Sequence, residues 1–121
     1  MGHLGDMDSK ERYLAEKLNA ARSDLMLPFP KGIARAVADA FGNAQLGLLN
    51  FKPAEDLPPT ILSYIDELKN FMNTDGVTVK SENEGGWHAK AETFTDDSLA
   101  RISLLIDELA TYFDHRGKRW A

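Results

Sequence analysis

The clearest pattern in the chain is an apolar stripe within residues 95–117. Its members recur at steps of three and four, which places them on one face of a helix. They are Leu99, Ile102, Leu105, Ile106, Leu109, Tyr112 and Phe113. Thr95 is suited to cap the first turn through its hydroxyl, with Phe94 and Leu99 at the two positions of a hydrophobic staple. Gly117 is expected to end the helix, because glycine tolerates the left-handed conformation of a C-terminal cap.

Two earlier segments show the same periodicity. The first is expected to begin at Asp8, which forms a capping-box-like pair with Glu11, and to end before the Pro-Phe-Pro of residues 28–30. Its apolar face consists of Leu14, Leu18, Ala21 and Leu25. The second runs from Lys31 or Gly32 towards Asn50, with a stripe of Ile33, Val37, Phe41, Ala44 and Leu48. Small residues beside this stripe would let another helix approach closely: Ala36, Ala40 and Gly47.

A third segment opens at Pro58-Pro59 and ends near Asp75-Gly76, with a broad apolar face between them. After Gly76 the periodicity changes. Residues 77–80 alternate like a strand, residues 81–86 are rich in turn formers, and residues 87–93 alternate again. This pattern favours either a β-hairpin or a long loop.

The four amphipathic segments predict a mainly α fold. Because the first two connections are short, neighbouring helices are expected to be antiparallel, forming an up-down-up-down four-helix bundle with a β-hairpin or long loop inserted before the last helix. At 121 residues the chain is long enough to bury one core. We therefore expect a single helical domain over residues 8–121, preceded by a flexible leader at residues 1–7.

Composition narrows the classes of function. The net charge of −5 argues against nucleic-acid binding, and no apolar run is long enough to span a bilayer. The chain has no cysteine, which excludes disulfides, thiolate metal sites and cysteine nucleophiles and is consistent with a cytoplasmic protein. Glu-x-x-His pairs of the kind that bind two metals in helix bundles are missing as well. We predict no catalytic residue, no metal site and no cofactor.

Trp87 and His88 are the most chemically suggestive pair. His88 would serve as an acid, a base or a ligand, with Trp87 as one wall of a pocket. We favour the simpler interpretation that Trp87 packs over the bundle and His88 faces solvent, because no second histidine or nucleophile lies at motif spacing. Likewise, the basic end at Arg116 and its neighbours either holds an acidic partner or complements the negative end of the last helix.

Several large apolar residues fall outside the predicted core stripes. On a helical wheel Leu104 lies opposite the stripe of its helix, beside Arg101 and Glu108, which are expected to pair across a two-fold axis. Leu46 occupies the equivalent place on the second helix. The candidate interaction surface therefore comprises Leu46, Leu49, Trp87, Leu104 and Trp120.

These patterns favour a non-enzymatic helical protein that acts through protein–protein contacts, as a homodimeric regulatory or accessory factor. The alternative is a small-molecule binding protein with a pocket between the bundle and the segment of Trp87 and His88. An enzyme ranks third, because serine, histidine and carboxylates are present but in no recognisable constellation.

Overall fold

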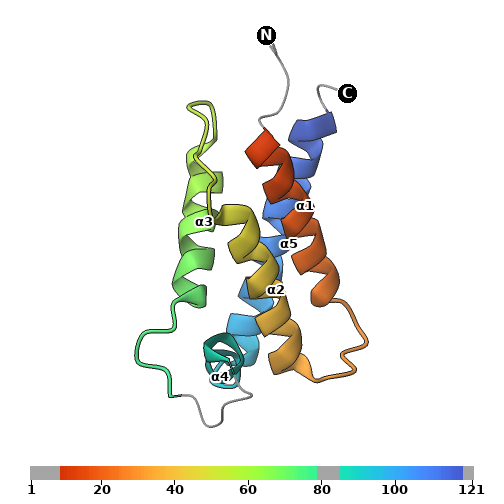
Figure 1. Ribbon diagram of the computed structural model, residues 1–121, viewed down its shortest axis with the longest axis vertical. Helices are drawn as coiled ribbons and strands as arrows, with labels where there is room; N and C mark the ends of the chain where they lie inside the picture. The colour runs from red at the N-terminus through yellow and green to blue at the C-terminus, as the bar shows by residue number, and fades with distance from the viewer. Residues whose placement is uncertain (1–8, 79–84, 119–121) are drawn as a thin grey trace.

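The computed structural model describes residues 9–78 and 85–118, and within them the regular structure is entirely helical (Figure 1). The described helices are α1 (Ser9–Asp24), α2 (Ile33–Leu48), α3 (Pro59–Met72), α4 (Gly86–Ala91) and α5 (Asp96–Lys118). The mainly α prediction is confirmed. The expected leader, residues 1–7, lies outside the described residues, as does Asp8.

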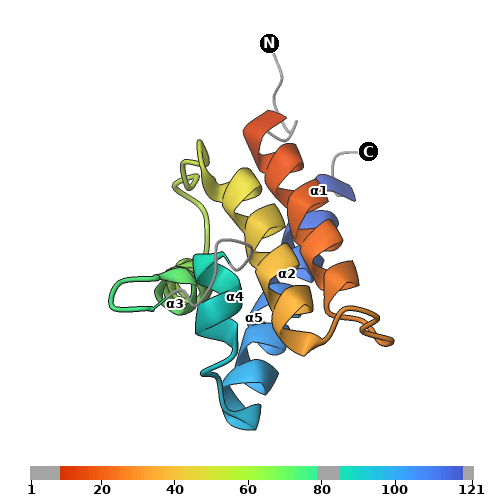
Figure 2. The same ribbon diagram turned by 60° about the horizontal axis from the view of Figure 1, so that its bottom comes forward.

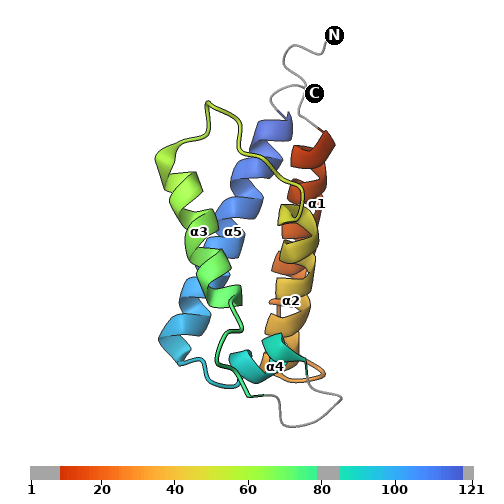
Figure 3. The same cartoon turned by 60° about the vertical axis from the view of Figure 1, so that its left-hand side comes forward.

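The four longer helices run in alternating directions along the long axis of the molecule (Figure 1). Helix α1 packs against α2 and α5, and α5 also packs against α3. Figure 3 shows the resulting pairs, with α3 beside α5 and α1 beside α2. In the view of Figure 1, α2 is on the side nearer the viewer and α5 is on the far side.

Helix α5 matches its predicted start and its predicted inner face. The backbone N–H of Ser98 donates to the Thr95 Oγ1 at 3.1 Å, so Thr95 is the N-cap. Five residues of the predicted stripe are fully buried together with Ala110, whereas Leu99 and Tyr112 are only partly buried; the five are Ile102, Leu105, Ile106, Leu109 and Phe113. The predicted end at Gly117 is wrong, because the helix continues through Lys118.

The predicted hairpin is wrong in its second arm. Residues 87–91 belong to helix α4, and no strand occurs in the described part of the chain. Residues 79–84, which include the end of the first predicted arm and most of the predicted turn at 81–86, lie outside it. Ala89, Lys90 and Ala91 are good helix formers, and both alanines are buried against the neighbouring helices. Alternation over seven residues cannot distinguish a strand from two helical turns, so tertiary packing decides the outcome.

One further expectation about a side chain is corrected. Ile33, expected in the core stripe of α2, is 42% exposed because it is the first residue of the helix, at the end of the molecule. Of the expected capping box, Asp8 lies outside the described residues, and Glu11 is buried and accepts a hydrogen bond from Arg116 Nε. Arg116 also donates to both carboxylate oxygens of Asp56, at 2.8 and 3.1 Å. The hydrogen bonds to Asp56 and the nearby charge of Glu11 raise the pKa of Arg116, and the hydrogen bonds to Asp56 contribute most.

Candidate functional site

Three of the predicted surface leucines are exposed in the structure. The exposed fraction is 48% for Leu46, 65% for Leu49 and 42% for Leu104. Trp87 is only partly exposed, and Trp120 lies outside the described residues. The three leucines thus lie on the solvent-facing sides of their helices, as the helical wheel predicts.

The exposed leucines do not form one surface. Leu46 and Leu49 lie at the C-terminal end of α2, whereas Leu104 lies on α5, and both Leu46 and Leu104 are opposite the buried stripes of their helices. Since α2 and α5 are on opposite sides of the molecule (Figure 1), these two outward positions face away from each other. A sequence cannot show this, because it depends on which helices are neighbours.

Arg101, three residues before Leu104 on α5, is already paired within the chain. Arg101 donates to both carboxylate oxygens of Glu67 on α3, at 2.5 and 2.7 Å, and its guanidinium lies 5.6 Å from the ring centre of Tyr64. The hydrogen bonds lower the pKa of Glu67 and raise the pKa of Arg101. The expected pairing of Arg101 across a two-fold axis therefore has to compete with a partner in its own chain.

The C-terminal half of α2 and the three residues after it differ sharply in composition from α5. No charged residue occurs in residues 40–51, although charged residues make up 27% of the chain. We call the exposed residues of this segment the α2 ridge: Gln45, Leu46, Leu49 and Asn50. The charge-free run is visible in the sequence and is the signal that would have separated α2 from α5.

Shallow grooves flank the α2 ridge on both sides. On the α1 side, Leu46 borders a groove of about 240 Å³ together with Tyr13, which is 43% exposed, and Phe51. On the α3 side, Leu49 borders a groove of about 300 Å³ with Met72. Tyr13 belongs to this surface and was missed by the sequence analysis, because its position on α1 gives no sign of its distance from α2.

Trp87 joins α4 to both α2 and α3. Its Nε1 donates to the backbone oxygen of Met72 at 2.9 Å, and its ring meets Phe41 edge to face at 6.3 Å. From the same helix, Lys90 Nζ donates to the backbone oxygens of Asn70 and Asn73. Helix α4 thus caps the C-terminal end of α3, whose last carbonyls would otherwise lack helical partners, and Figure 2 shows it between α3 and α2.

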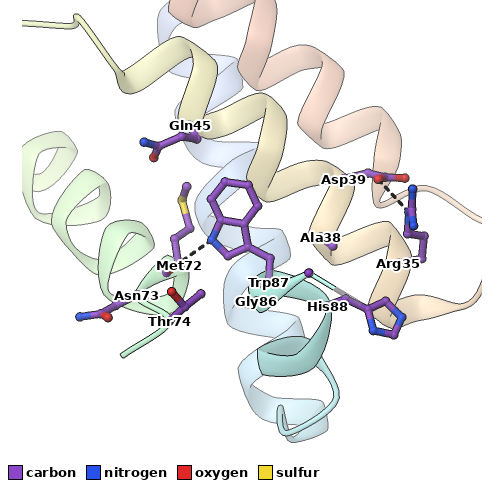
Figure 4. Close-up of a pocket in the computed structure, with 11 residues that line it drawn as sticks. Arg35, Ala38, Asp39, Gln45, Met72, Asn73, Thr74, Gly86, Trp87 and His88 are labelled. Carbon is purple, nitrogen blue, oxygen red and sulfur yellow. Dashed lines mark hydrogen bonds and ion pairs between the residues drawn. The ribbon is translucent and has the colours of Figure 1, made fainter. Parts of the chain in front are cut away.

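An open cleft of about 640 Å³ lies beside Trp87 (Figure 4). It is bordered by α2, by Asn73 and Thr74 after the end of α3, and by the start of α4. His88 lies on this border with its side chain 30% exposed, its Nδ1 3.9 Å from Glu92 Oε1. The structure therefore places both predicted pocket residues at one cleft, and it also gives Trp87 the packing role that we favoured.

Within the described ranges, no three histidine, aspartate or glutamate side chains are grouped closely enough to hold a metal ion. No described helix is both long and apolar enough to cross a membrane.

Comparison with known proteins adds no further assignment. No protein-family model matches this chain, and no match was found among curated proteins or among solved structures. The function therefore has to be argued from the geometry of the chain itself.

Proposed function

We propose that this chain is a non-enzymatic helical protein that acts through protein–protein contacts, as a homodimeric regulatory or accessory factor, with the α2 ridge at its interface. One observation carries the proposal: Leu46 and Leu49 are both exposed within a segment, residues 40–51, that has no charged residue. The nearest charges are at the grooves on either side, where Lys10 and Lys69 form part of the border. Depletion of charge combined with exposed apolar side chains is the compositional mark of an interface centre.

The shape of this face fits a second copy of the same chain. In the up-down-up-down bundle that we propose for α1, α2, α3 and α5, α2 presents a ridge with a groove along each flank. A two-fold axis brings the same surface to itself, so the leucines of one ridge can enter the grooves of the other. Ridge and groove thus occur together on one surface, as a self-complementary contact requires.

Electrostatics favours the same face. Each copy carries a net charge of −5, so two copies repel each other at most orientations. Contact through residues 40–51 places no pair of like charges at the centre of the interface. Burial of a leucine side chain contributes about 1.5–3 kcal/mol when it is complete, and a dimer would bury two from each copy more fully.

The proposal narrows the candidate interaction surface. Leu46 and Leu49 remain in it, and Tyr13 joins them from α1. Leu104 lies on α5, on the other side of the molecule and near the ion pair of Arg101 with Glu67, and Trp87 is held by Met72 and Phe41. We further propose a cytoplasmic location without a nucleic-acid partner, supported by the lack of cysteine and by the negative net charge.

Light scattering across a dilution series tests the interface. The wild-type chain should approach twice its mass of 13.5 kDa at high concentration and dissociate on dilution. The double variant Leu46→Glu/Leu49→Glu should stay monomeric, because it would bury four carboxylates at the centre of the contact. Leu104→Glu is the matched control and should dimerise like the wild type. Circular dichroism should show unchanged helix content in both variants.

Two results would contradict the proposal in different ways. A wild-type chain that stays monomeric at every concentration would exclude the homodimer. A dimer that is broken by Leu104→Glu and tolerates the double variant would move the interface to α5.

A further inference from the structure

The cleft beside Trp87 has a fixed apolar wall. The indole is held by the hydrogen bond from Nε1 to Met72 and by the edge-to-face contact with Phe41. Lys90 fastens the same short helix to the end of α3. Since these contacts lie within the chain, the wall needs no ligand to form it, and sites for small molecules are commonly preformed in this way.

Polar groups on the border of the cleft have unused hydrogen-bonding capacity. Arg35 contacts Asp39 through Nε alone, at 3.2 Å, which leaves its two terminal nitrogens without a partner among the described residues. The side-chain amide of Gln45 and the hydroxyl of Thr74 are likewise unpartnered within that part of the chain. Arginine has five N–H donors and no acceptor, so the border offers more donors than acceptors.

Asp39 is the one carboxylate among the described residues that line the cleft. Its side chain is 50% exposed and its Oδ1 is already paired with Arg35, so solvent and the guanidinium screen its charge. The planar end of the Arg35 guanidinium can still bind a second carboxylate through two parallel hydrogen bonds. Figure 4 shows Trp87 between Arg35 on one side and Gln45 on the other.

We infer that the cleft binds a small carboxylate with a flat apolar body, the carboxylate at Arg35 and the flat body against the indole of Trp87. The volume of about 640 Å³ is within the range of sites for small molecules. The apolar wall of Trp87 and Met72 supplies contact area, and the surplus of donors selects an acceptor-rich group. This site shares Gln45 with the α2 ridge, but Arg35 and Trp87, which would hold the ligand, lie outside the ridge.

Nuclear magnetic resonance of the full chain, with 2-naphthoate as the probe, tests this inference. The indole Nε1–H resonance of Trp87 is the readout, and the Trp120→Phe variant assigns it, since the chain has two tryptophans. We expect a saturable shift with 2-naphthoate. The uncharged amide 2-naphthamide, which has the same ring system, should bind at least about tenfold more weakly, as expected for loss of a charge-assisted hydrogen bond.

Two arginine variants separate the cleft from a general effect of charge. Arg35→Gln should weaken binding of 2-naphthoate about tenfold and leave 2-naphthamide unchanged. Arg12→Gln removes the same charge from an exposed position on α1 and should bind like the wild type. The inference is overturned by the lack of a saturable shift, by equal binding of the two probes, or by an Arg35→Gln variant that binds 2-naphthoate normally while its thermal melt shows a folded chain.

Discussion

Helices α5 and α2 both bury one face in the same core, but they are stabilised in different ways. Helix α5 has a side-chain cap at Thr95, and Asp96 and Asp97 lie at the positive end of its dipole. Helix α2 begins after Gly32 without a side-chain cap bond, and it has no acidic residue in its first turn and no basic residue in its last. Helix α5 is therefore stabilised partly by its own cap and first-turn carboxylates, whereas α2 depends on its packing against α1 and α4.

The outer faces of the two helices differ in the same sense. On the outer face of α5, Arg101 is paired with Glu67 and Asp107 with Arg22, so two of its charged residues form ion pairs within the chain. On α2, an ion pair of Arg35 with Asp39 lies in the first half of the helix, and the uncharged ridge follows in the second half. A single exposed leucine beside charged side chains is an ordinary surface residue. Two exposed leucines on the uncharged ridge are instead consistent with the contact that we propose.

The largest expected effect concerns the two faces of α5. Leu109→Ala should lower the free energy of unfolding by about 2–5 kcal/mol, because Leu109 is fully buried and its removal leaves a cavity. Leu104→Ala, on the outer face of the same helix, should change it by less than about 0.5 kcal/mol. Urea denaturation measures both. Equal losses for the two variants would show that the outer face of α5 is not simply solvated.

The second test concerns the dependence of α2 on packing. A Cβ added at Gly47 would lie 2.9 Å from Leu14 Cδ1 and 3.0 Å from Lys17 Cβ, which is too close for a carbon contact. Alanine raises helix propensity by about 1 kcal/mol, but overpacking costs about 1–3 kcal/mol. Gly47→Ala should therefore destabilise the fold by about 1 kcal/mol in thermal or urea denaturation.

Gly42 provides the matched control on the same helix. A Cβ there would lie 3.9 Å from Trp87 Cζ3, an ordinary contact, so Gly42→Ala should stabilise the fold by up to about 1 kcal/mol. If both alanines stabilise the protein, local propensity outweighs the close approach of α1 and α2. The contrast between α2 and α5 would then be weaker than the structure indicates.

Features that depend on neighbouring residues can be predicted from the sequence, whereas contacts between distant segments cannot. The cap at Thr95, the inner face of α5 and the opening of α3 at Pro59 depend on residues within a few positions of each other, and all three are confirmed. The contact between Arg116 and Glu11 joins residues 105 positions apart, so no local sequence pattern could predict it.

Helix α4 fails as a prediction for a related reason. Its six residues are too few for a clear period, and it is held by contacts of Trp87 and Lys90 with the end of α3. The candidate site was only partly predictable. The exposure of Leu46 and Leu49 follows from the helical wheel, but their separation from Leu104 and the donors that gather near Trp87 require the tertiary fold.

The smallest expected effect tests the local signals of α5. In the structure the Thr95 hydroxyl accepts the N–H of Ser98, one of the donors that the first turn leaves without a helical partner. Thr95→Ala removes that acceptor and should cost about 1 kcal/mol in urea denaturation. Thr95→Ser keeps the hydroxyl and should restore most of the loss. If alanine and serine give the same midpoint and slope, α5 does not depend on this cap, and its stability, like that of α2, comes from packing alone.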